Sequence, residues 1–286
     1  MSNDTYPKFI LGESLTEEQI KYFDKNGFIH FRGVVSKEEI SEIITSTEDL
    51  QQKWITKGLK KINGVPIKYG HDENGKEIVH RFPFTSQYCE SVHRFVTSNK
   101  VQSLKVLLPD GSRIAENEKD GVIVNHYVNT SHSKFRQMGW HTDSMRDIFY
   151  GKKVMPMLNV GLYLDDSSSD KGGLRIIPGT HKQNIFSMLF KKAYFMNNEE
   201  DKNEMLVDAK AGDLVIHDGR IWHRVAMSPN TGAASRRRVM YIPVIVGKYM
   251  HLKKAVHLCI IIFRNWLSNQ YKLIRMESAK LIPFFI

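Results

Sequence analysis

The sequence predicts a mainly β protein with flanking helices, in which antiparallel sheets form a sandwich or a barrel. From about residue 121, apolar residues recur with period two, as half-buried strands require. Turn residues separate these strand-like runs, and most of the runs have no helix between them, which favours antiparallel over parallel sheets. The residues before 121 instead carry helix-start signals and helical spacing.

The N-terminal part, residues 1–120, is predicted to be mostly helical. Thr16 is followed three residues later by Gln19, a capping-box pattern, and an Asn-Gly pair ends the predicted helix. A second capping box begins at Ser36 and opens another helix. Between the two helices, residues 28–31 (FIHF) predict the one strand of this part.

The predicted β core spans residues 121–247. Its six strand-like runs are GVIVNHYV (121–128), GWHTD (139–143), MLNVGLYL (157–164), GGLRIIPGTH (172–181), GDLVIHDGRIWHRV (212–225) and RRVMYIPVIV (237–246). The polar, charged stretch 183–210 interrupts them and is expected to be an insertion or lid at the mouth of the core. The basic tail 248–286 has apolar residues at helical spacing and predicts a helical segment. We expect all 286 residues to form a single domain.

Composition bounds the class of protein. The chain is 41% hydrophobic and 25% charged, which is typical of a folded protein and excludes a disordered or collagen-like one. Its net charge of +10 favours anionic partners, such as a carboxylate or phosphate substrate, nucleic acid or an acidic membrane surface. Two cysteines fit a reducing compartment, and the longest apolar run, 259–263, is far shorter than the roughly 20 residues of a membrane helix. We therefore expect a cytoplasmic protein, at most peripheral at a membrane.

The first chemical motif is the run Trp140-His141-Thr142-Asp143. Residues two apart on a strand point to the same face, so His141 and Asp143 would place an imidazole and a carboxylate in the same space. With a second histidine they would form a two-histidine, one-carboxylate set, which leaves three positions of an octahedral iron open. That set suits a non-heme Fe(II) centre that binds a cosubstrate and oxygen together. The spacing alone is weakly specific, because His-x-Asp also occurs by chance at surface strand ends.

Two histidines are candidates for the distal ligand, His217 and His223. They lie on either side of the turn signal Asp218-Gly219 within the run 212–225. The spacing does not choose between them.

Three consecutive arginines, Arg236, Arg237 and Arg238, open the last strand-like run. An arginine fork binds a carboxylate through paired N–H···O bonds, which a lysine cannot copy. The alternative is a solvated charge cluster or a phosphate-binding patch. Because neighbouring residues of a strand point to opposite faces, a one-residue error in register would exchange Arg237 with its neighbours.

Several segments in order resemble the phytanoyl-CoA dioxygenase family of Fe(II)/2-oxoglutarate-dependent oxygenases. They are LTEEQIKYFDKNGFIHFRGVVSKEEI (15–40), GGLRIIPGTHK (172–182), GDLVIHDGRIWHRVAMSPN (212–230) and RRVMYIPVIV (237–246). Each is modestly specific alone, and the resemblance extends from the first to the last of them, residues 15–246, which is nearly the whole chain. The resemblance implies a double-stranded β-helix, a jelly-roll core of the cupin kind.

The resemblance also implies roles for individual residues. The ligand histidine of the family precedes the Pro-Asn stretch, which falls on His223 and leaves His217 as a neighbour. Metal binding is thus assigned to His141, Asp143 and His223. Arg237 best matches the arginine that binds 2-oxoglutarate, with Arg236 or Arg238 as the alternative. Asn125 and Thr142 resemble positions that hydrogen-bond 2-oxoglutarate.

One position departs from the family pattern. Relatives commonly have Gln between the first histidine and the aspartate, where this chain has Thr142, a residue expected to point away from the metal. Asp143 is a true carboxylate, whereas relatives that halogenate carry Gly or Ala there. Halogenation is therefore not expected.

The implied activity is a dioxygenase that uses Fe(II), 2-oxoglutarate and O2 to hydroxylate an aliphatic C–H, releasing succinate and CO2. The substrate is expected to be a small or lipid-like molecule, for which the charge favours an anion. Nucleic acid is not expected, because no basic stripe interleaved with aromatic residues is present. For the tail 248–286 two interpretations stay open: a helix packed on the core with a solvated basic face, or a surface that makes peripheral contact with anionic lipid. The competing hypothesis is a non-catalytic, cupin-like module that binds a metal or ligand.

Overall fold

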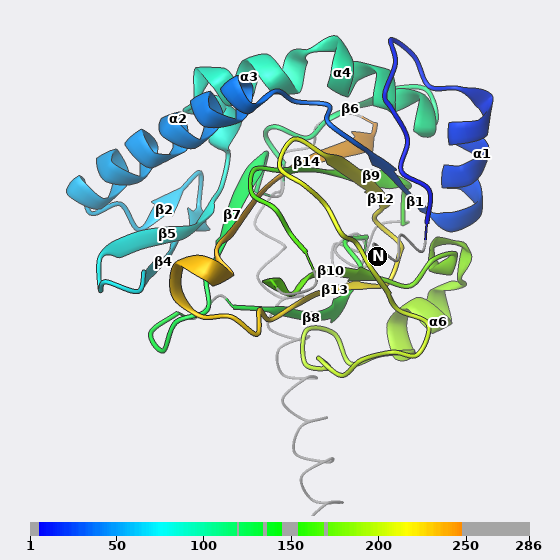
Figure 1. Ribbon diagram of the computed structural model, residues 1–286. Coiled ribbons are helices and arrows are strands. Elements are labelled where there is room, and N and C mark those ends of the chain that lie inside the picture. Colours follow the sequence, from blue (N-terminus) through cyan, green and yellow to red (C-terminus); the bar gives the residue numbers. More distant parts are fainter. Residues whose placement is uncertain (1–5, 119, 134–135, 145–153, 169–170, 248–286) are drawn as a thin grey trace, which may run out of the picture. The chain divides into compact units, whose positions relative to one another are not determined.

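The computed structural model describes residues 6–118, 120–133, 136–144, 154–168 and 171–247. Two β-sheets face each other, and helices cover the outer side of the larger sheet (Figure 1). This is the arrangement of a jelly roll, so the predicted fold class is confirmed. All elements named below belong to one compact unit formed within residues 1–144 and 155–249. The predicted helical tail 248–286 lies outside the described residues, and the single-domain organisation stays a prediction.

The larger sheet is antiparallel throughout. Its strands follow the order β1 (Phe28–Phe31), β12 (Leu214–Asp218), β9 (Met157–Tyr163), β14 (Arg237–Val246), β7 (Ile123–Tyr127), β5 (Glu77–Phe82) and β4 (Lys68–His71), and β6 (Ser112–Ile114) pairs with the end of β14. Side chains of β14 alternate between two hydrophobic clusters. Met240 and Ile242 pack on the helix side, while Val239 and Tyr241 face the smaller sheet.

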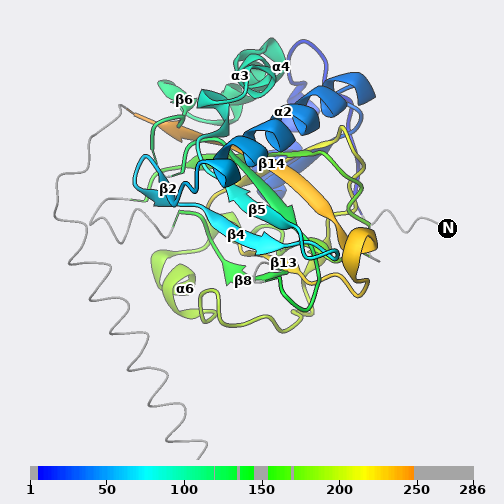
Figure 2. The same ribbon diagram turned by 90° about the vertical axis from the view of Figure 1, so that its left-hand side faces the viewer.

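The smaller sheet faces the side of the larger sheet that carries Val239 and Tyr241 (Figure 2). Its strands follow the order β11 (Met205–Leu206), β10 (Gly173–Ile176), β13 (His223–Ala226) and β8 (Met138–His141). The predicted single run 212–225 is therefore two strands, β12 and β13, which belong to different sheets. The turn at Asp218-Gly219 carries the chain from one sheet to the other, and this places His223 opposite His141.

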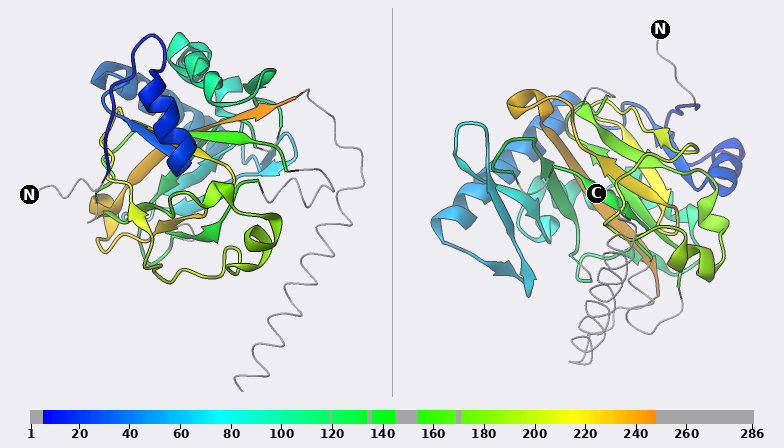
Figure 3. Two further views of the ribbon diagram at one scale, coloured as in Figure 1. Left: turned by 90° about the vertical axis from the view of Figure 1, so that its right-hand side faces the viewer. Right: turned by 90° about the horizontal axis from the view of Figure 1, so that it is seen from below.

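The helices of the N-terminal part pack against the outer face of the larger sheet (Figure 3). They are α1 (Glu17–Asn26), α2 (Lys37–Thr56), α3 (Glu90–Thr97) and α4 (Asn99–Gln102), with short 3-10 turns at Thr85–Gln87, Ser103–Leu107, Thr180–Lys182 and Gly232–Ser235. Both predicted capping boxes are confirmed, at Thr16 and at Ser36. Gly27 ends α1 with a φ of 75°, a left-handed conformation that favours glycine.

The N-terminal part holds more strands than the sequence predicts. Besides β1, the structure has β4, β5 and β6 in the larger sheet and a small hairpin of β2 (Lys61–Ile62) and β3 (Val65–Pro66). The expectation of one strand was wrong. Most of the extra strands are very short, and β5 buries Ile78, Val79 and Phe82 without the period-two alternation on which a strand prediction depends.

The predicted insertion 183–210 contains α6 (Ile185–Phe190) and β11. Its strand β11 pairs with β10 in the smaller sheet, and side-chain contacts add to this anchor. The Nε1 of Trp140 donates to the carbonyl oxygen of Glu199 at 2.8 Å, and the Arg224 guanidinium forms an ion pair with Glu204. Among the described residues, no helix combines the length and the apolar character needed to cross a membrane.

Candidate metal centre

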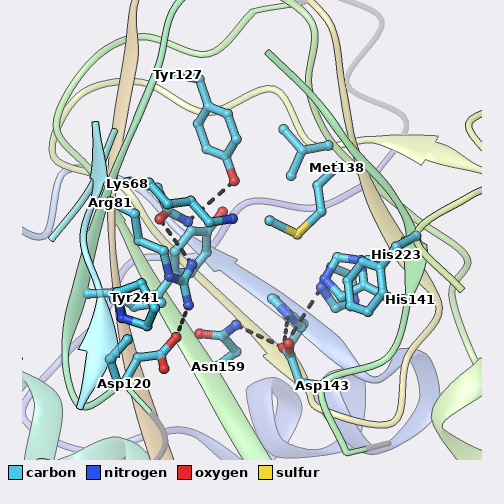
Figure 4. A pocket seen from close by; sticks show the side chains of 17 residues that line it. Lys68, Arg81, Asp120, Tyr127, Met138, His141, Asp143, Asn159, His223 and Tyr241 are labelled. Carbon is cyan, nitrogen blue, oxygen red and sulfur yellow. Dashed lines mark hydrogen bonds and ion pairs between the residues drawn. The ribbon is translucent and has the colours of Figure 1, made fainter. Parts of the chain in front are cut away.

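The structure brings the three predicted ligands together. His141 ends β8, Asp143 follows two residues later, and His223 begins β13, directly opposite His141 in the paired strands. One ligand atom from each lies within 4.8 Å of the others. Figure 4 shows both imidazoles on one wall of a cavity, with the Asp143 carboxylate beside them. Two nitrogens and one oxygen at this spacing form the donor set of a non-heme Fe(II) site.

The backbone fixes which ring nitrogen each histidine offers. Nδ1 of His141 donates to the carbonyl oxygen of Gly139 at 2.7 Å, and Nδ1 of His223 donates to that of Ile221 at 3.1 Å. Since the acceptors are carbonyls, Nδ1 carries the proton and Nε2 presents its lone pair. The Phe195 ring stacks on the His141 ring, with 4.8 Å between centroids, and holds that orientation. Both imidazoles are thus oriented for metal binding.

Burial and neighbouring charges set the protonation of the ligands. Burial lowers the pKa of both His141 and His223, so both rings are neutral near pH 7. Burial alone would raise the pKa of Asp143, but His223, His217 and His141 together lower it below its ordinary value. The Nδ2 of Asn159 donates to Oδ2 of Asp143 at 2.9 Å. The site therefore presents one anionic and two neutral donors, the protonation that a divalent metal requires.

His217, the other candidate for the distal ligand, lies beside the ligand set rather than far from it. Its Nε2 is 3.4 Å from Oδ2 of Asp143, and its ring centroid is 4.6 Å from that of His223. The side chain is 1% exposed, and neither ring nitrogen has a hydrogen-bond partner among the described residues. The triad of described residues that can hold a metal is nevertheless His141, Asp143 and His223.

The three arginines of β14 have different surroundings. Arg236 lies 3.4 Å from a carboxylate oxygen of Glu73 at the surface, and Arg238 forms a bidentate pair with Asp165 at 2.8 Å. Arg237 is 3% exposed and points to the inner side of the sheet. The alternation of β14 therefore sends Arg237 inward and its two neighbours outward, as the predicted register requires.

Arg237 is a buried cation that lacks a carboxylate partner among the described residues. Its Nη2 donates to the carbonyl oxygen of Ala226 at 3.1 Å, its guanidinium lies 5.2 Å from the centroid of the Tyr127 ring, and its Nε has no partner. Burial lowers its pKa. The buried Oγ of Ser167 is also unpartnered, and a Cβ added at Gly173 would lie 2.7 Å from it and 3.7 Å from Arg237. Arg237 and Ser167 are thus donors without a full set of partners, and Gly173 leaves space beside them. Donors and space together fit a bound carboxylate.

The cavity in front of the metal ligands has a volume of about 390 Å³. Asn125 lines it, with its Oδ1 accepting from Arg81 at 3.2 Å and its Nδ2 donating to the Tyr127 hydroxyl at 3.3 Å. Thr142 is not among the lining residues. Its hydroxyl lies on the opposite side of the strand, 2.8 Å from that of Tyr194, so the structure does not support the predicted contact with 2-oxoglutarate.

With this geometry in place, the comparisons with known proteins are decisive for the family. The family model named "Phytanoyl-CoA dioxygenase (PhyH)" matches residues 23–238. The chain belongs to the phytanoyl-CoA dioxygenase family. It is an Fe(II)- and 2-oxoglutarate-dependent dioxygenase, and the predicted cofactors fit the donor set described above.

A relative and two solved structures show what the chain is similar to. A probable alpha-ketoglutarate-dependent hypophosphite dioxygenase of Stutzerimonas stutzeri is 23% identical over 77% of this chain and 75% of its own. AviO1 from Streptomyces viridochromogenes has a similar fold, with a TM-score of 0.58 at 16% identity, covering 82% of this chain and 97% of its own. EctD from S. alaskensis, solved with 2-oxoglutarate and 5-hydroxyectoine, has a TM-score of 0.59 at 15% identity over 81% and 76%.

In this member of the phytanoyl-CoA dioxygenase family, sequence reasoning missed several cavity residues. Lys68 and Arg81 come from the β4–β5 hairpin, which carries no clear strand signal. Phe195 comes from the insertion 183–210. Asn159 was detectable in principle, because it is the lone polar side chain in the apolar run of β9. A polar residue inside such a run indicates a specific hydrogen-bond partner, which here is Asp143.

Proposed function

We propose that this dioxygenase hydroxylates an aliphatic C–H bond of a small molecule, releasing succinate and CO2. The observation that carries the proposal is the His141–Asp143–His223 set, with both imidazoles buried and both Nε2 atoms presented by backbone hydrogen bonds. Bound iron, 2-oxoglutarate and oxygen would supply the oxidising chemistry. Membership of the phytanoyl-CoA dioxygenase family supports this use of the site.

In this proposal the protein binds the metal, orients 2-oxoglutarate and excludes water from the site. His141, Asp143 and His223 would hold the metal, and a set of only three protein ligands would leave positions free for cosubstrate and oxygen. Arg237 pairs with the far carboxylate of 2-oxoglutarate, which supplies the partner that its buried guanidinium lacks. Phe195, stacked on His141, excludes water on the side of the insertion 183–210, which acts as the lid.

The substrate class is proposed from the cavity and the relatives. The cavity in front of the metal ligands, of about 390 Å³, favours a small molecule. HygX from Streptomyces hygroscopicus was solved with hygromycin B, and EctD with 5-hydroxyectoine. These compounds differ from each other and from hypophosphite, so a shared fold does not fix the substrate.

A lipid-like substrate and peripheral membrane contact stay proposals. Both rest on the basic, amphipathic sequence of residues 248–286, which lie outside the described residues. The proposal expects flotation with anionic liposomes to decrease when these residues are removed. Equal flotation of the full chain and the truncated chain would contradict it.

The test of the catalytic proposal uses anaerobic protein loaded with Fe(II). Adding 2-oxoglutarate should give the visible charge-transfer absorption of the bound cosubstrate, and admitting oxygen should give succinate. His141→Ala and Asp143→Ala should each lose bound iron and succinate together, while His93→Ala, a change at an exposed histidine, should lose neither. Wild-type succinate formation by His141→Ala would refute the proposal. Metal and 2-oxoglutarate binding by the wild type without succinate would instead favour the non-catalytic module.

A further inference from the structure

One aromatic side chain of the insertion 183–210 lies directly on a metal ligand. The ring of Phe195 stacks on that of His141, with 4.8 Å between centroids and 27° between the ring planes. The rest of the ring is open, since the residue is 55% exposed and lines the cavity in front of the ligands. Phe195 therefore offers an apolar surface to a molecule that enters the cavity.

The backbone at Phe195 has a conformation that a bulky residue seldom adopts. Its φ is 60°, in the left-handed region, which is unfavourable for phenylalanine and easier for glycine or asparagine. Two backbone hydrogen bonds of 2.9 Å hold the segment on β8, from the N–H of Phe195 to the carbonyl oxygen of Trp140 and from the N–H of Trp140 to that of Asn197. A Cβ added at Gly139 would lie 2.6 Å from the carbonyl oxygen of Phe195, so this close approach needs a glycine. Strained residues that their surroundings hold in place cluster at functional sites.

Simpler explanations do not account for this placement. Packing in the core would bury Phe195, whereas more than half of it is exposed. Orienting His141 is not a sufficient reason, because a backbone hydrogen bond orients both His141 and His223. A single exposed aromatic residue is ordinary on a protein surface, and Phe186 of the same insertion is such a residue, 71% exposed and outside the lining of the cavity. Phe195 differs because it combines backbone strain with a contact to a metal ligand.

The apolar surface continues on the smaller sheet. Met138 of β8 and Val225 of β13 are partners in the antiparallel register, next to the pair of His141 and His223. Both line the cavity, and Figure 4 shows Met138 beside the two imidazoles. With Phe195 they place apolar groups around the metal-binding histidines. Such a wall favours an apolar part of a ligand at this point of the cavity.

We propose that Phe195 determines substrate specificity, because its ring packs on an apolar group of the substrate and holds the C–H bonds of that group beside the metal. The inference rests on the proposed function and names the substrate class of the same site, a small molecule with an apolar ring or chain. Such a group covers the exposed face of Phe195 and removes apolar surface from water. A hydroxylated group of the same size would lose its hydrogen bonds to water and find no partners at this wall.

The test measures binding to protein loaded with Ni(II), which does not turn over, and saturated with 2-oxoglutarate. Cyclohexanol is the apolar probe, and myo-inositol, which carries a hydroxyl on every carbon of the same ring, is the polar control in a titration followed by ligand NMR. We expect cyclohexanol to bind about tenfold more tightly than myo-inositol. Phe195→Asn should remove most of this preference, and Phe195→Leu should retain most of it. Phe186→Asn removes the same ring from the same insertion and should change nothing.

A purely structural role of Phe195 gives a different result. Asparagine adopts the left-handed conformation more readily, so Phe195→Asn should not lower the Tm of the ligand-free protein while it loses the preference for cyclohexanol. If the ring only orients His141, the variant would weaken Ni(II) binding and change the binding of both probes equally, which would overturn the inference.

The wild type provides a second criterion. Equal binding of cyclohexanol and myo-inositol, or binding of neither, would overturn the inference, and so would equal effects of Phe195→Asn and Phe186→Asn. The failure of the proposed function is distinguishable, because it appears earlier, as a lack of 2-oxoglutarate binding to the metal-loaded wild type.

Discussion

At the scale of single residues, the two histidines of β12 and β13 differ in the bonds that orient them. His223 has its Nδ1 bound to a carbonyl and its Nε2 directed at the ligand set, whereas His217 has neither nitrogen hydrogen-bonded. A ring that is fixed before the metal arrives loses less entropy on binding. His223 is therefore the better ligand, and His217 acts through its contact with Asp143.

Alanine at each histidine separates these roles. His223→Ala should abolish stoichiometric iron binding, because one of three protein ligands is lost. His217→Ala should keep the iron and weaken its affinity by about tenfold, the usual effect of removing a group that supports a ligand. Metal content after desalting and a competitive chelator titration measure the two effects. Loss of iron in His217→Ala with retention in His223→Ala would reverse the assignment.

The arginines of β14 offer an internal control for cosubstrate binding. Arg237→Met should raise the KM for 2-oxoglutarate by roughly 30-fold while bound iron is unchanged, because a buried carboxylate loses its charged partner. Arg236→Met removes only a surface pair with Glu73 and should change the KM by less than about threefold. Steady-state succinate formation gives both values. A larger effect in Arg236→Met would show that the register of β14 is different.

His126 makes stability depend on pH. Burial, then the charges of Arg238 and Arg236, lower its pKa to about 3, against about 6.5 in an unfolded chain. Below pH 6.5 the unfolded chain takes up a proton that the folded chain does not, so this contribution is full above pH 6.5 and is lost as pH falls toward 3. We expect wild type to lose about 1 kcal/mol more unfolding free energy than His126→Gln between pH 6.5 and 5. Urea denaturation at both pH values measures this, with His93→Gln, at an exposed histidine, expected to match wild type.

At the scale of elements, the capping boxes are local devices that the sequence reveals fully. The Ser36 hydroxyl accepts from the backbone N–H of Glu39, and the Glu39 carboxylate accepts from that of Ser36. Ser36→Ala should lower the unfolding free energy by about 1 kcal/mol, because donors at the start of α2 lose their partner. Ser41→Ala, at an exposed position inside the same helix, should change it by less than about 0.5 kcal/mol. Chemical denaturation of both variants tests the difference, and equal values would contradict it.

Elements could be predicted when the residues that determine them are neighbours in the sequence. The helix starts at Thr16 and Ser36 and the long strand β14 were predicted because caps and period-two patterns are written in neighbouring residues. The β4–β5 hairpin was missed because it shows no period-two alternation, and it joins the larger sheet by pairing with β7, far along the chain. The cavity residues Lys68 and Arg81 were missed with it.

The candidate site divides in the same way. His141 and Asp143 share a local motif, and the resemblance to the family supplied His223, which sequence spacing alone did not distinguish from His217. Thr142 shows where the resemblance alone is a poor guide. Strand alternation already predicted that it points away from the metal, and the structure places its hydroxyl against that of Tyr194. Contacts between distant segments, such as Asn159 with Asp143, needed the fold.

At the scale of the whole molecule, the site joins the two sheets. Two metal ligands are on the smaller sheet and Arg237 is on the larger one. Ligands that bind the folded state alone stabilise it by mass action, so Ni(II) with 2-oxoglutarate should raise Tm by about 5 °C at a hundredfold excess over Kd. Chelator-treated protein should show no shift with 2-oxoglutarate alone, and Asp143→Ala should show none with both. Thermal scans with each combination test this, and a full shift from 2-oxoglutarate without metal would contradict it.

The metal-binding histidines and Arg237 lie on opposite sheets, so the distance between the sheets selects the length of the oxo acid that can reach both. Two packed sheets keep a spacing of about 10 Å, which side chains wedged between them hold constant. An oxo acid shortened by one methylene carries the same two carboxylates but cannot contact the metal site and Arg237 at once. Oxaloacetate should consequently be a poor replacement for 2-oxoglutarate, and trimming a side chain wedged between the sheets should make the enzyme less selective for chain length.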